Sequence, residues 1–270
     1  MRLLVTRPAM DAAALADLLA AQGHDVLISP MIHIELNAVE LPDATAHGGL
    51  ALTSANGVRA LMAHLAQLPN AQRDAQMAAW AARPAFAVGP QTAAALQAAG
   101  FQNIHQADGD VDALIDLIVA DFAVDDAVDD AVDDAVDDAE DLPLLHIAGR
   151  DRAGELVGGL KAQNIACGRA VLYRAEAAAG FSPAAKAALG DAQEPVEGVV
   201  IYSQRSADIF CALYAALADE LAQREAAIAA PMAFCLSEAI AAQMRAAGFE
   251  AFAPPRPDSA ALLALLSPNR

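Results

Sequence analysis

Short apolar runs alternate with longer Ala- and Leu-rich segments along this chain, and this alternation limits the folds open to it. At the N-terminus, residues 3–6 are predicted as a strand, 10–22 as a helix that ends at Gly23, and 26–29 as a second strand. Two strands joined through a helix pair in parallel. We expect further strands at residues 50–53, 86–88, around Ile104, 144–147, 170–173, 199–202, 233–236 and 251–252. Helices between most of them predict an α/β fold, in which parallel sheets carry helices on both faces.

The chain also resembles itself. Residues 49–54 and the helix after them resemble residues 198–203 and their helix, and residues 86–101 resemble 234–249. A repeat of this size predicts two similar domains, each a parallel sheet flanked by helices in the manner of flavodoxin. Two such sheets that face each other would form a cleft, which is the usual place for a small-molecule site.

The charge is strongly negative and partly local. The net charge is −19, which excludes a general nucleic-acid binder because such a protein needs a basic face. Residues 121–141 hold eleven acidic side chains and no basic one, including four copies of Val-Asp-Asp-Ala at 124–139, which leaves −8 for the rest. Closely spaced aspartates repel one another, so we expect a solvated, mobile insertion. It lacks the glycine and carbonyl ligands of a calcium loop.

No apolar run approaches the roughly 18 residues of a membrane-spanning helix. The N-terminal segment has too few apolar residues for a secretory signal. The three cysteines, Cys167, Cys211 and Cys235, are odd in number and share no close spacing, so we expect buried free thiols, with neither a disulfide nor a zinc site. We therefore expect a soluble, cytoplasmic protein.

Polar residues follow most of the predicted strands. In a parallel sheet the carboxyl ends of the strands meet at one edge with the N-termini of the next helices, and that edge favours anions. Four arginines lie at strand ends in a chain with only 16 Lys and Arg, and carboxylate recognition is a natural use for them. The candidate binding residues are Arg7, Ser54, Asn56, Gly89, Thr92, Arg150, Arg152, Ser203, Arg205 and Ser237. Helix capping and surface ion pairs also use these residue types, so a structural role is the alternative to carboxylate binding at each position.

Several familiar chemistries have no signature in the sequence. The glycine patterns of dinucleotide and P-loop nucleotide binding are missing, as is the hydrolase G-x-S-x-G elbow. Six histidines are scattered without a metal-ligand pattern, so no metal site is expected. Tyr173 ends a predicted strand, where it could pack in the core or donate a proton at a cleft edge.

The order and spacing of these turns resemble the uroporphyrinogen-III synthase family over nearly the whole chain outside the acidic insertion. The matching segments are Val5-Thr6-Arg7-Pro8, Leu52-Thr53-Ser54-Ala55-Asn56-Gly57-Val58, Ala87-Val88-Gly89-Pro90-Gln91-Thr92-Ala93, Gly149-Arg150 before a helix, and Leu172-Tyr173-Arg174. Two positions depart from the family pattern. Ser237-Glu238-Ala239-Ile240 stands where many members have Gly-Pro-Thr-Thr, and Tyr202-Ser203 stands where the family has its second Thr-Ser.

The resemblance implies two α/β domains joined by a two-stranded linker, with the chain returning to its first domain. Residues 1–32 and 177–270 would form one domain and 37–171 the other, with linkers at 33–36 and 172–176. A plain tandem duplication would instead divide the chain near Asp141, and the repeat alone does not distinguish the two.

The reaction that the resemblance implies is cyclisation of hydroxymethylbilane, a linear tetrapyrrole, to uroporphyrinogen III. Water is lost and the last ring is inverted through a spiro intermediate, with no cofactor or metal. By the resemblance, Tyr173 would donate a proton to the leaving hydroxyl, and the strand-end groups would bind substrate carboxylates. We expect a monomer that binds neither nucleic acid nor membrane. The alternatives are a non-catalytic two-domain protein that binds a small anion and a flavodoxin-like regulatory module; the first is commonly exported, and the second would need acidic groups where this chain has Arg7.

Overall fold

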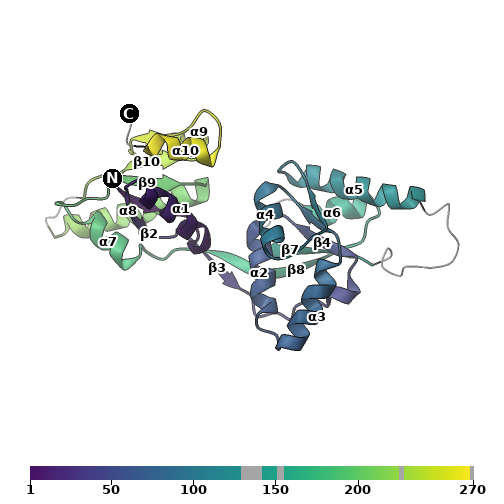
Figure 1. Ribbon diagram of the computed structural model, residues 1–270. Coiled ribbons are helices and arrows are strands. Elements are labelled where there is room, and N and C mark those ends of the chain that lie inside the picture. The colour runs from purple at the N-terminus through teal and green to yellow at the C-terminus, as the bar shows by residue number, and fades with distance from the viewer. Residues whose placement is uncertain (129–141, 151–154, 225–227, 268–270) are drawn as a thin grey trace. The chain divides into compact units, whose positions relative to one another are not determined.

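The computed structural model describes residues 1–128, 142–150, 155–224 and 228–267, and its chain forms two compact units. Unit 1 consists of Met1–His33 and Glu176–Arg270, and unit 2 consists of Ile34–Ala175. The chain therefore leaves unit 1 after one strand–helix–strand segment and returns to it for the last third of its length (Figure 1).

Unit 1 is built on a five-stranded sheet in which every pairing is parallel. Its strands lie in the order β11-β10-β9-β1-β2, so the N-terminal strand occupies an interior position. The bounds are β1 Arg2–Val5, β2 Asp25–Ile28, β9 Gly198–Ile201, β10 Met232–Cys235 and β11 Ala251–Phe252. β1 pairs in parallel with β2 on one side and with β9 on the other, and β9 pairs in parallel with β10.

Helices cover both faces of this sheet. They are α1 Ala9–Ala21, α7 Pro183–Leu189, α8 Gln204–Ala222, α9 Glu238–Ala246 and α10 Ser259–Leu266. Side chains alternate along β1: Leu4 joins the core with α7, α8 and α9, whereas Leu3 and Val5 join the core with α1 and α10. Burial on both faces is why these strands are almost continuously apolar.

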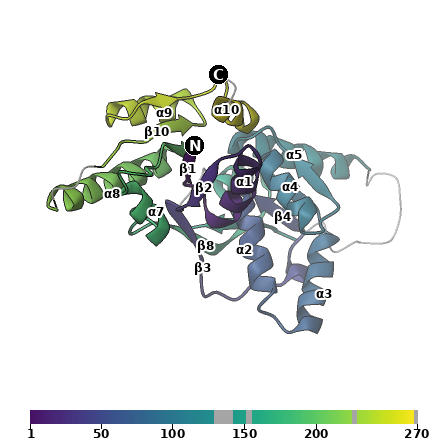
Figure 2. The same ribbon diagram turned by 60° about the vertical axis from the view of Figure 1, so that its left-hand side comes forward.

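Unit 2 is built on a six-stranded sheet with the order β3-β8-β7-β4-β5-β6. The bounds are β3 Ile32–Leu36, β4 Gly49–Leu52, β5 Ala85–Ala87, β6 Ile104–Gln106, β7 Leu144–Gly149 and β8 Cys167–Ala177. The pairings from β8 through β6 are parallel. One face packs against α2 Ala55–Leu65, α3 Asn70–Ala81 and α4 Pro90–Ala98, and the other against α5 Val111–Val128 and α6 Leu156–Ala162. Four of these helices, α2 to α5, are labelled in Figure 2.

The two strands at the unit boundary, β3 and β8, are neighbours in the sheet. The Asn37 N–H donates to the Leu172 carbonyl at 2.8 Å and the Ala178 N–H donates to the Met31 carbonyl at 2.9 Å, so the strands run in opposite directions. β8 is one unbroken strand of 11 residues. The expected strand at 170–173 and the expected linker at 172–176 are therefore parts of the same element.

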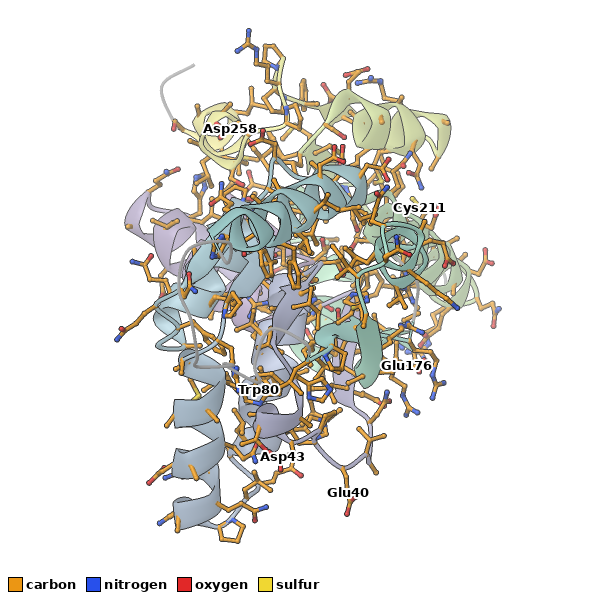
Figure 3. All side chains as sticks on the ribbon, turned by 90° about the vertical axis from the view of Figure 1, so that its right-hand side faces the viewer. Glu40, Asp43, Trp80, Glu176, Cys211 and Asp258 are labelled. Atoms are coloured by element: carbon orange, nitrogen blue, oxygen red, sulfur yellow. The ribbon has the colours of Figure 1, made fainter. Side chains whose placement is uncertain are left out.

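A short 3₁₀ helix, η1 Ala44–Ala46, was not expected from the sequence. Asp43 caps it by accepting from the Thr45 N–H at 3.0 Å, and the same carboxylate accepts from the Gln76 side chain of α3 at 2.9 Å. These bonds, the one from Gln76 foremost, lower the pKa of Asp43. Trp80, labelled in Figure 3, is fully buried near the end of α3. Its ring centroid lies 5.7 Å from that of His47.

The predicted α/β class is confirmed, and the expected strands are present with ends displaced by one or a few residues. α5 continues to Val128, so it includes the first residues of the expected insertion at 121–141. Leu114 and Ile118 are fully buried on its inner face, and Asp121 lies 3.0 Å from Nδ1 of His105 on β6. Most of the repeat at 124–139 lies outside the described residues. Among the described helices, none has both the length and the apolarity needed to cross a bilayer.

The start of β4 supplies a test of the packing. A Cβ on Gly49 would lie 2.7 Å from the backbone oxygen of Pro84, which cannot move without disturbing the neighbouring strand β5. We expect Gly49→Ala to lower the free energy of unfolding by about 1–3 kcal/mol, measured by urea denaturation. Gly168→Ala in β8 is the control: its Cβ would meet nothing closer than 3.7 Å, so a change within about 0.5 kcal/mol is expected. Equal losses in the two variants would contradict this account.

Candidate functional site

Arg7 follows β1 at the carboxyl edge of the unit 1 sheet. Its guanidinium lies 3.3 Å from the Asp11 carboxylate, one turn into α1, and 4.3 Å above the centre of the Tyr202 ring, which follows β9. The Arg7 side chain is 20% exposed. These two contacts hold a cation at the edge while leaving part of it open to an anion.

The other predicted groups of unit 1 begin helices. Ser203 caps α8: its Oγ accepts from the Ser206 N–H at 3.1 Å and its hydroxyl donates to Ser206 Oγ at 2.8 Å. Arg205 is exposed in the first turn of the same helix. Ser237 precedes α9, and within the described part of the chain its side chain makes no capping hydrogen bond to that helix. Glu238, a departure from the family pattern, forms an ion pair with Arg245.

In unit 2 the predicted groups follow β4 and β5. Ser54 caps α2 by accepting from the Asn56 N–H at 3.2 Å, and Asn56 Oδ1 accepts from Arg59 at 2.8 Å. Gly89 precedes α4 in extended conformation. Thr92, in the first turn of α4, is only 3% exposed. Among the predicted binding residues that the structure describes, Thr92 is therefore the least accessible.

Tyr173 lies where β7 and β8 meet the same edge. It pairs with Gly149 across a register shift, and its carbonyl accepts from the Arg150 N–H at 2.9 Å. A Cβ on Gly149 would lie 2.8 Å from Cε2 and 2.9 Å from Cζ of the Tyr173 ring. The ring therefore rests directly on a position that has no side chain, with the residue 8% exposed. Arg150 is exposed beside it, and Arg152 lies outside the described residues.

Each sheet thus gathers its own set of groups. Arg7, Ser203, Arg205 and Ser237 follow the adjacent strands β1, β9 and β10 of unit 1. Ser54, Asn56, Gly89, Thr92, Arg150 and Tyr173 follow or end the adjacent strands β5, β4, β7 and β8 of unit 2. Parallel pairing brings together residues that are far apart in sequence.

His146 is a group that the sequence reasoning did not select. It lies on β7, is 6% exposed, and has its Nε2 3.3 Å from the Oγ1 of Thr53. Burial and, secondarily, the charge of Arg169 lower the pKa of His146 from 6.5 to about 4, so its imidazole is neutral at physiological pH. A polar residue inside the apolar run 144–148 was the available signal.

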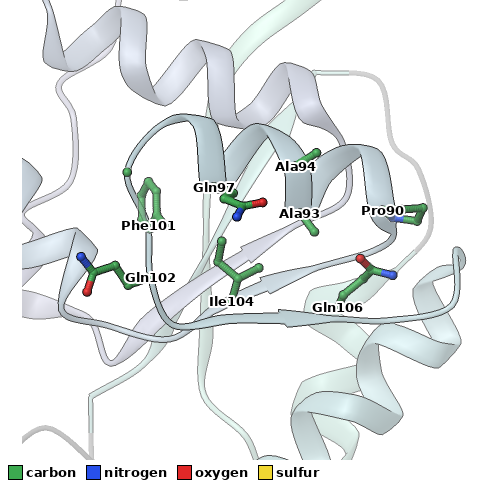
Figure 4. A pocket seen from close by; sticks show the side chains of 9 residues that line it. Pro90, Ala93, Ala94, Gln97, Phe101, Gln102, Ile104 and Gln106 are labelled. Atoms are coloured by element: carbon green, nitrogen blue, oxygen red, sulfur yellow. The ribbon is translucent and has the colours of Figure 1, made fainter.

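A groove of about 770 Å³ lies elsewhere on unit 2, between α4 and β6 (Figure 4). Its walls include Pro90, Gln97, Phe101, Ile104 and Gln106, and none of its lining side chains is charged. It contains none of the predicted site residues, and its chemistry does not suit a polyanion. The described residues include no cluster of three or more side chains suited to a metal ion.

Two α/β units, each built on a sheet whose central strands pair in parallel and end in candidate anion-binding groups, define the class of protein to which this fold belongs. The family model for uroporphyrinogen-III synthase HemD matches residues 13–264, and the chain belongs to this family. The protein is a cyclising hydro-lyase of heme biosynthesis. It converts hydroxymethylbilane to uroporphyrinogen III, with loss of water and inversion of the last ring through a spiro intermediate.

A solved structure of a related synthetase has the same fold. The crystal structure of uroporphyrinogen-III synthetase from Helicobacter pylori is similar over 100% of both chains, with 18% identity and a TM-score of 0.59. A mutant uroporphyrinogen III synthase from Thermus thermophilus matches over 98% of this chain and 96% of that one, with 16% identity and a TM-score of 0.48. No curated protein gave a match.

The buried imidazole predicts a pH dependence of stability. Below pH 6.5 the unfolded chain binds a proton at His146 that the folded chain takes up only near pH 4, so acidification lowers the free energy of unfolding. Between pH 7 and pH 5 this group alone should account for about 2 kcal/mol. Urea denaturation of the wild type and of His146→Gln at both pH values checks it: the wild type should lose more stability than the variant. Equal losses would show that the imidazole is not held neutral by the fold.

Proposed function

We propose that Tyr173 protonates the hydroxyl group that leaves hydroxymethylbilane. The placement of Tyr173 carries this proposal: it ends the parallel run of β8 at the same edge as the candidate anion-binding groups of unit 2, against Gly149. A phenol keeps its proton at neutral pH and can give it up in the transition state. As the proton passes from the phenol oxygen to the hydroxyl oxygen, the carbon–oxygen bond breaks, its electron pair leaves with water, and a cationic azafulvene remains.

The rest of the reaction is a matter of positioning. The last ring must attack the cationic carbon through its own substituted carbon, which gives the spiro intermediate and then the inverted ring. Without guidance the same cation closes to the symmetrical type I isomer. Holding the chain ends in the reactive geometry is therefore where most of the catalytic effect should arise.

The strand-end groups supply the positioning through the substrate's acetate and propionate carboxylates. In unit 1 these groups are Arg7, Ser203, Arg205 and Ser237. In unit 2 they are Ser54, Asn56, Gly89, Thr92, Arg150 and, outside the described residues, Arg152. The N-termini of α2, α4, α8 and α9 add backbone N–H donors at the same edges.

The net charge of −19 is compatible with a polyanionic substrate for a local reason. Helix N-termini and guanidinium groups act over a few ångströms, whereas the charge of residues more than a Debye length away is largely screened. A modest negative potential near the reacting carbon would also favour the azafulvene cation.

The chain is also divided into two domains and two linkers. The two domains are residues 1–32 with 177–270, and residues 37–171. The linkers between them are 33–36 and 172–176, and the pairing of β3 with β8 supports this division.

A cytoplasmic location suits the three free cysteines. Burial raises the pKa of Cys235 to about 12 and of Cys167 to about 11, so both are unreactive thiols at neutral pH.

Tyr173→Phe tests the acid. It keeps the ring against Gly149 and removes only the hydroxyl, so we expect kcat for uroporphyrinogen III formation to fall by about 10²-fold or more. The matched control is Tyr214→Phe, whose ring packs among Phe210 and Phe249 in the core of unit 1 and should keep full turnover. Type III and type I isomers are separated chromatographically. Full turnover by Tyr173→Phe would show that another group is the acid.

A monomer is the proposed working form. In the part of the chain that the structure describes, the exposed large apolar side chains come from different segments rather than from one helix face: Leu18, Ile28, Leu36, Val39 and Phe252. Sedimentation of the active enzyme should give a mass near 27.8 kDa at assay concentrations. A mass of twice that value, retained on dilution, would contradict the proposal.

A further inference from the structure

We infer that His146 is a positioning residue that orients the hydroxyl of Thr53 as a hydrogen-bond donor to a substrate carboxylate. This inference rests on the proposed function, because it assumes that the carboxyl edge of the unit 2 sheet binds the substrate. It adds to that function a buried histidine and a threonine that act as a pair.

The pairing of β4 with β7 places the two residues together. Ala51 of β4 is in register with His146 of β7, so both side chains lie on the face that packs against α5 and α6. Thr53 is two residues beyond Ala51, on the same face and past the end of the strand. The distance between Thr53 Oγ1 and His146 Nε2 is 3.3 Å. His146 is buried and Thr53 is half-buried, so the threonine is the more accessible member of the pair.

The position of the imidazole proton decides what Thr53 can do. Neutral histidine has one N–H, and within the described part of the chain the Nδ1 of His146 is buried without a hydrogen-bond partner. A buried N–H without an acceptor is rarer in proteins than an acceptor left with a free lone pair. The proton therefore belongs on Nε2, where it is donated to Thr53 Oγ1.

This hydrogen bond leaves the hydroxyl proton of Thr53 for another acceptor. Because Oγ1 accepts from the imidazole, its own O–H points away from His146. Thr53 itself follows β4 at the carboxyl edge, next to Ser54, which caps α2. A carboxylate only accepts hydrogen bonds, so a hydroxyl fixed as a donor matches it. An unfixed hydroxyl could turn and present its lone pairs to the same anion.

The surroundings of His146 keep the imidazole in this neutral form. Arg169 is its register partner on β8 and donates to the Gly149 carbonyl at 2.7 Å, so a cation already lies beside the ring. Cys167, on the same face of β8, is an uncharged thiol at neutral pH. Among the described residues, no carboxylate acts on His146 to favour an imidazolium.

Two variants of His146 separate orientation from packing. The side-chain amide of His146→Gln reaches the place of Nε2 and can still donate to Thr53, whereas that of His146→Asn ends near the place of Nδ1 and cannot. Both replace the ring by a neutral amide, so their effects on folding should be similar. We expect His146→Asn to raise KM for hydroxymethylbilane about tenfold and His146→Gln to leave it within about twofold of the wild type.

A double-mutant cycle then connects the effect to Thr53. Thr53→Val should raise KM about tenfold, Thr53→Ser should restore it, and His146→Asn should have no further effect in the Thr53→Val background. Thermal unfolding of each variant shows whether it is folded. If one member of the cycle does not fold, the comparison of His146→Asn with His146→Gln still decides whether the histidine orients Thr53.

Two results would overturn the inference about His146 and Thr53. A Thr53→Val variant with wild-type KM would overturn the inference, because Thr53 would then not contact the substrate. An equal effect of His146→Asn in both backgrounds would also overturn it, since the histidine would be acting on the fold alone. In both cases the wild type would still form the type III isomer and Tyr173→Phe would still be impaired, so the proposed function would stand. Wild-type protein that yields only type I product at the uncatalysed rate would instead end the proposed function itself.

Discussion

Parallel pairing of strands is the constraint on which the rest of the structure depends. In a parallel sheet every strand ends at the same edge, and every following helix begins there. In unit 1 this brings the turn after β1 beside the turns after β9 and β10, although nearly two hundred residues separate β1 from β9. In unit 2 it brings the turns after β4, β5 and β7 beside Tyr173 of β8. The two candidate edges are consequences of strand order rather than of proximity in the sequence.

Much of this arrangement could be predicted because apolar periodicity and turn chemistry are local. The strands of both sheets were expected nearly where they lie, and the groups at their ends followed from the parallel order. The outcome at β8 was less visible, since one strand of 11 residues serves both as a sheet member and as part of the connection. The helical course of α5 through residues 121–128 was not expected, because repulsion among aspartates was considered without the buried Leu114 and Ile118 or the pair between His105 and Asp121.

Contacts that depend on the register between strands could not be predicted from the sequence. His146 lies opposite Ala51 and close to Thr53 only because β4 and β7 pair with that particular alignment. Arg7 was selected as a strand-end cation, but its ion pair with Asp11 and its position over Tyr202 depend on three-dimensional structure. Tyr202, which differs from the family pattern, therefore has a visible role as the platform for Arg7. Thr92 shows the converse, because its place at the start of α4 is as expected and yet its side chain is buried.

The contact between Tyr173 and Gly149 has an evolutionary consequence. The aromatic ring occupies the space that a β-carbon at position 149 would need. Any larger residue there would have to displace the ring or be accompanied by a smaller residue at 173. Drift at these two positions should therefore be coupled, and descendants of this protein that keep the tyrosine should also keep the glycine.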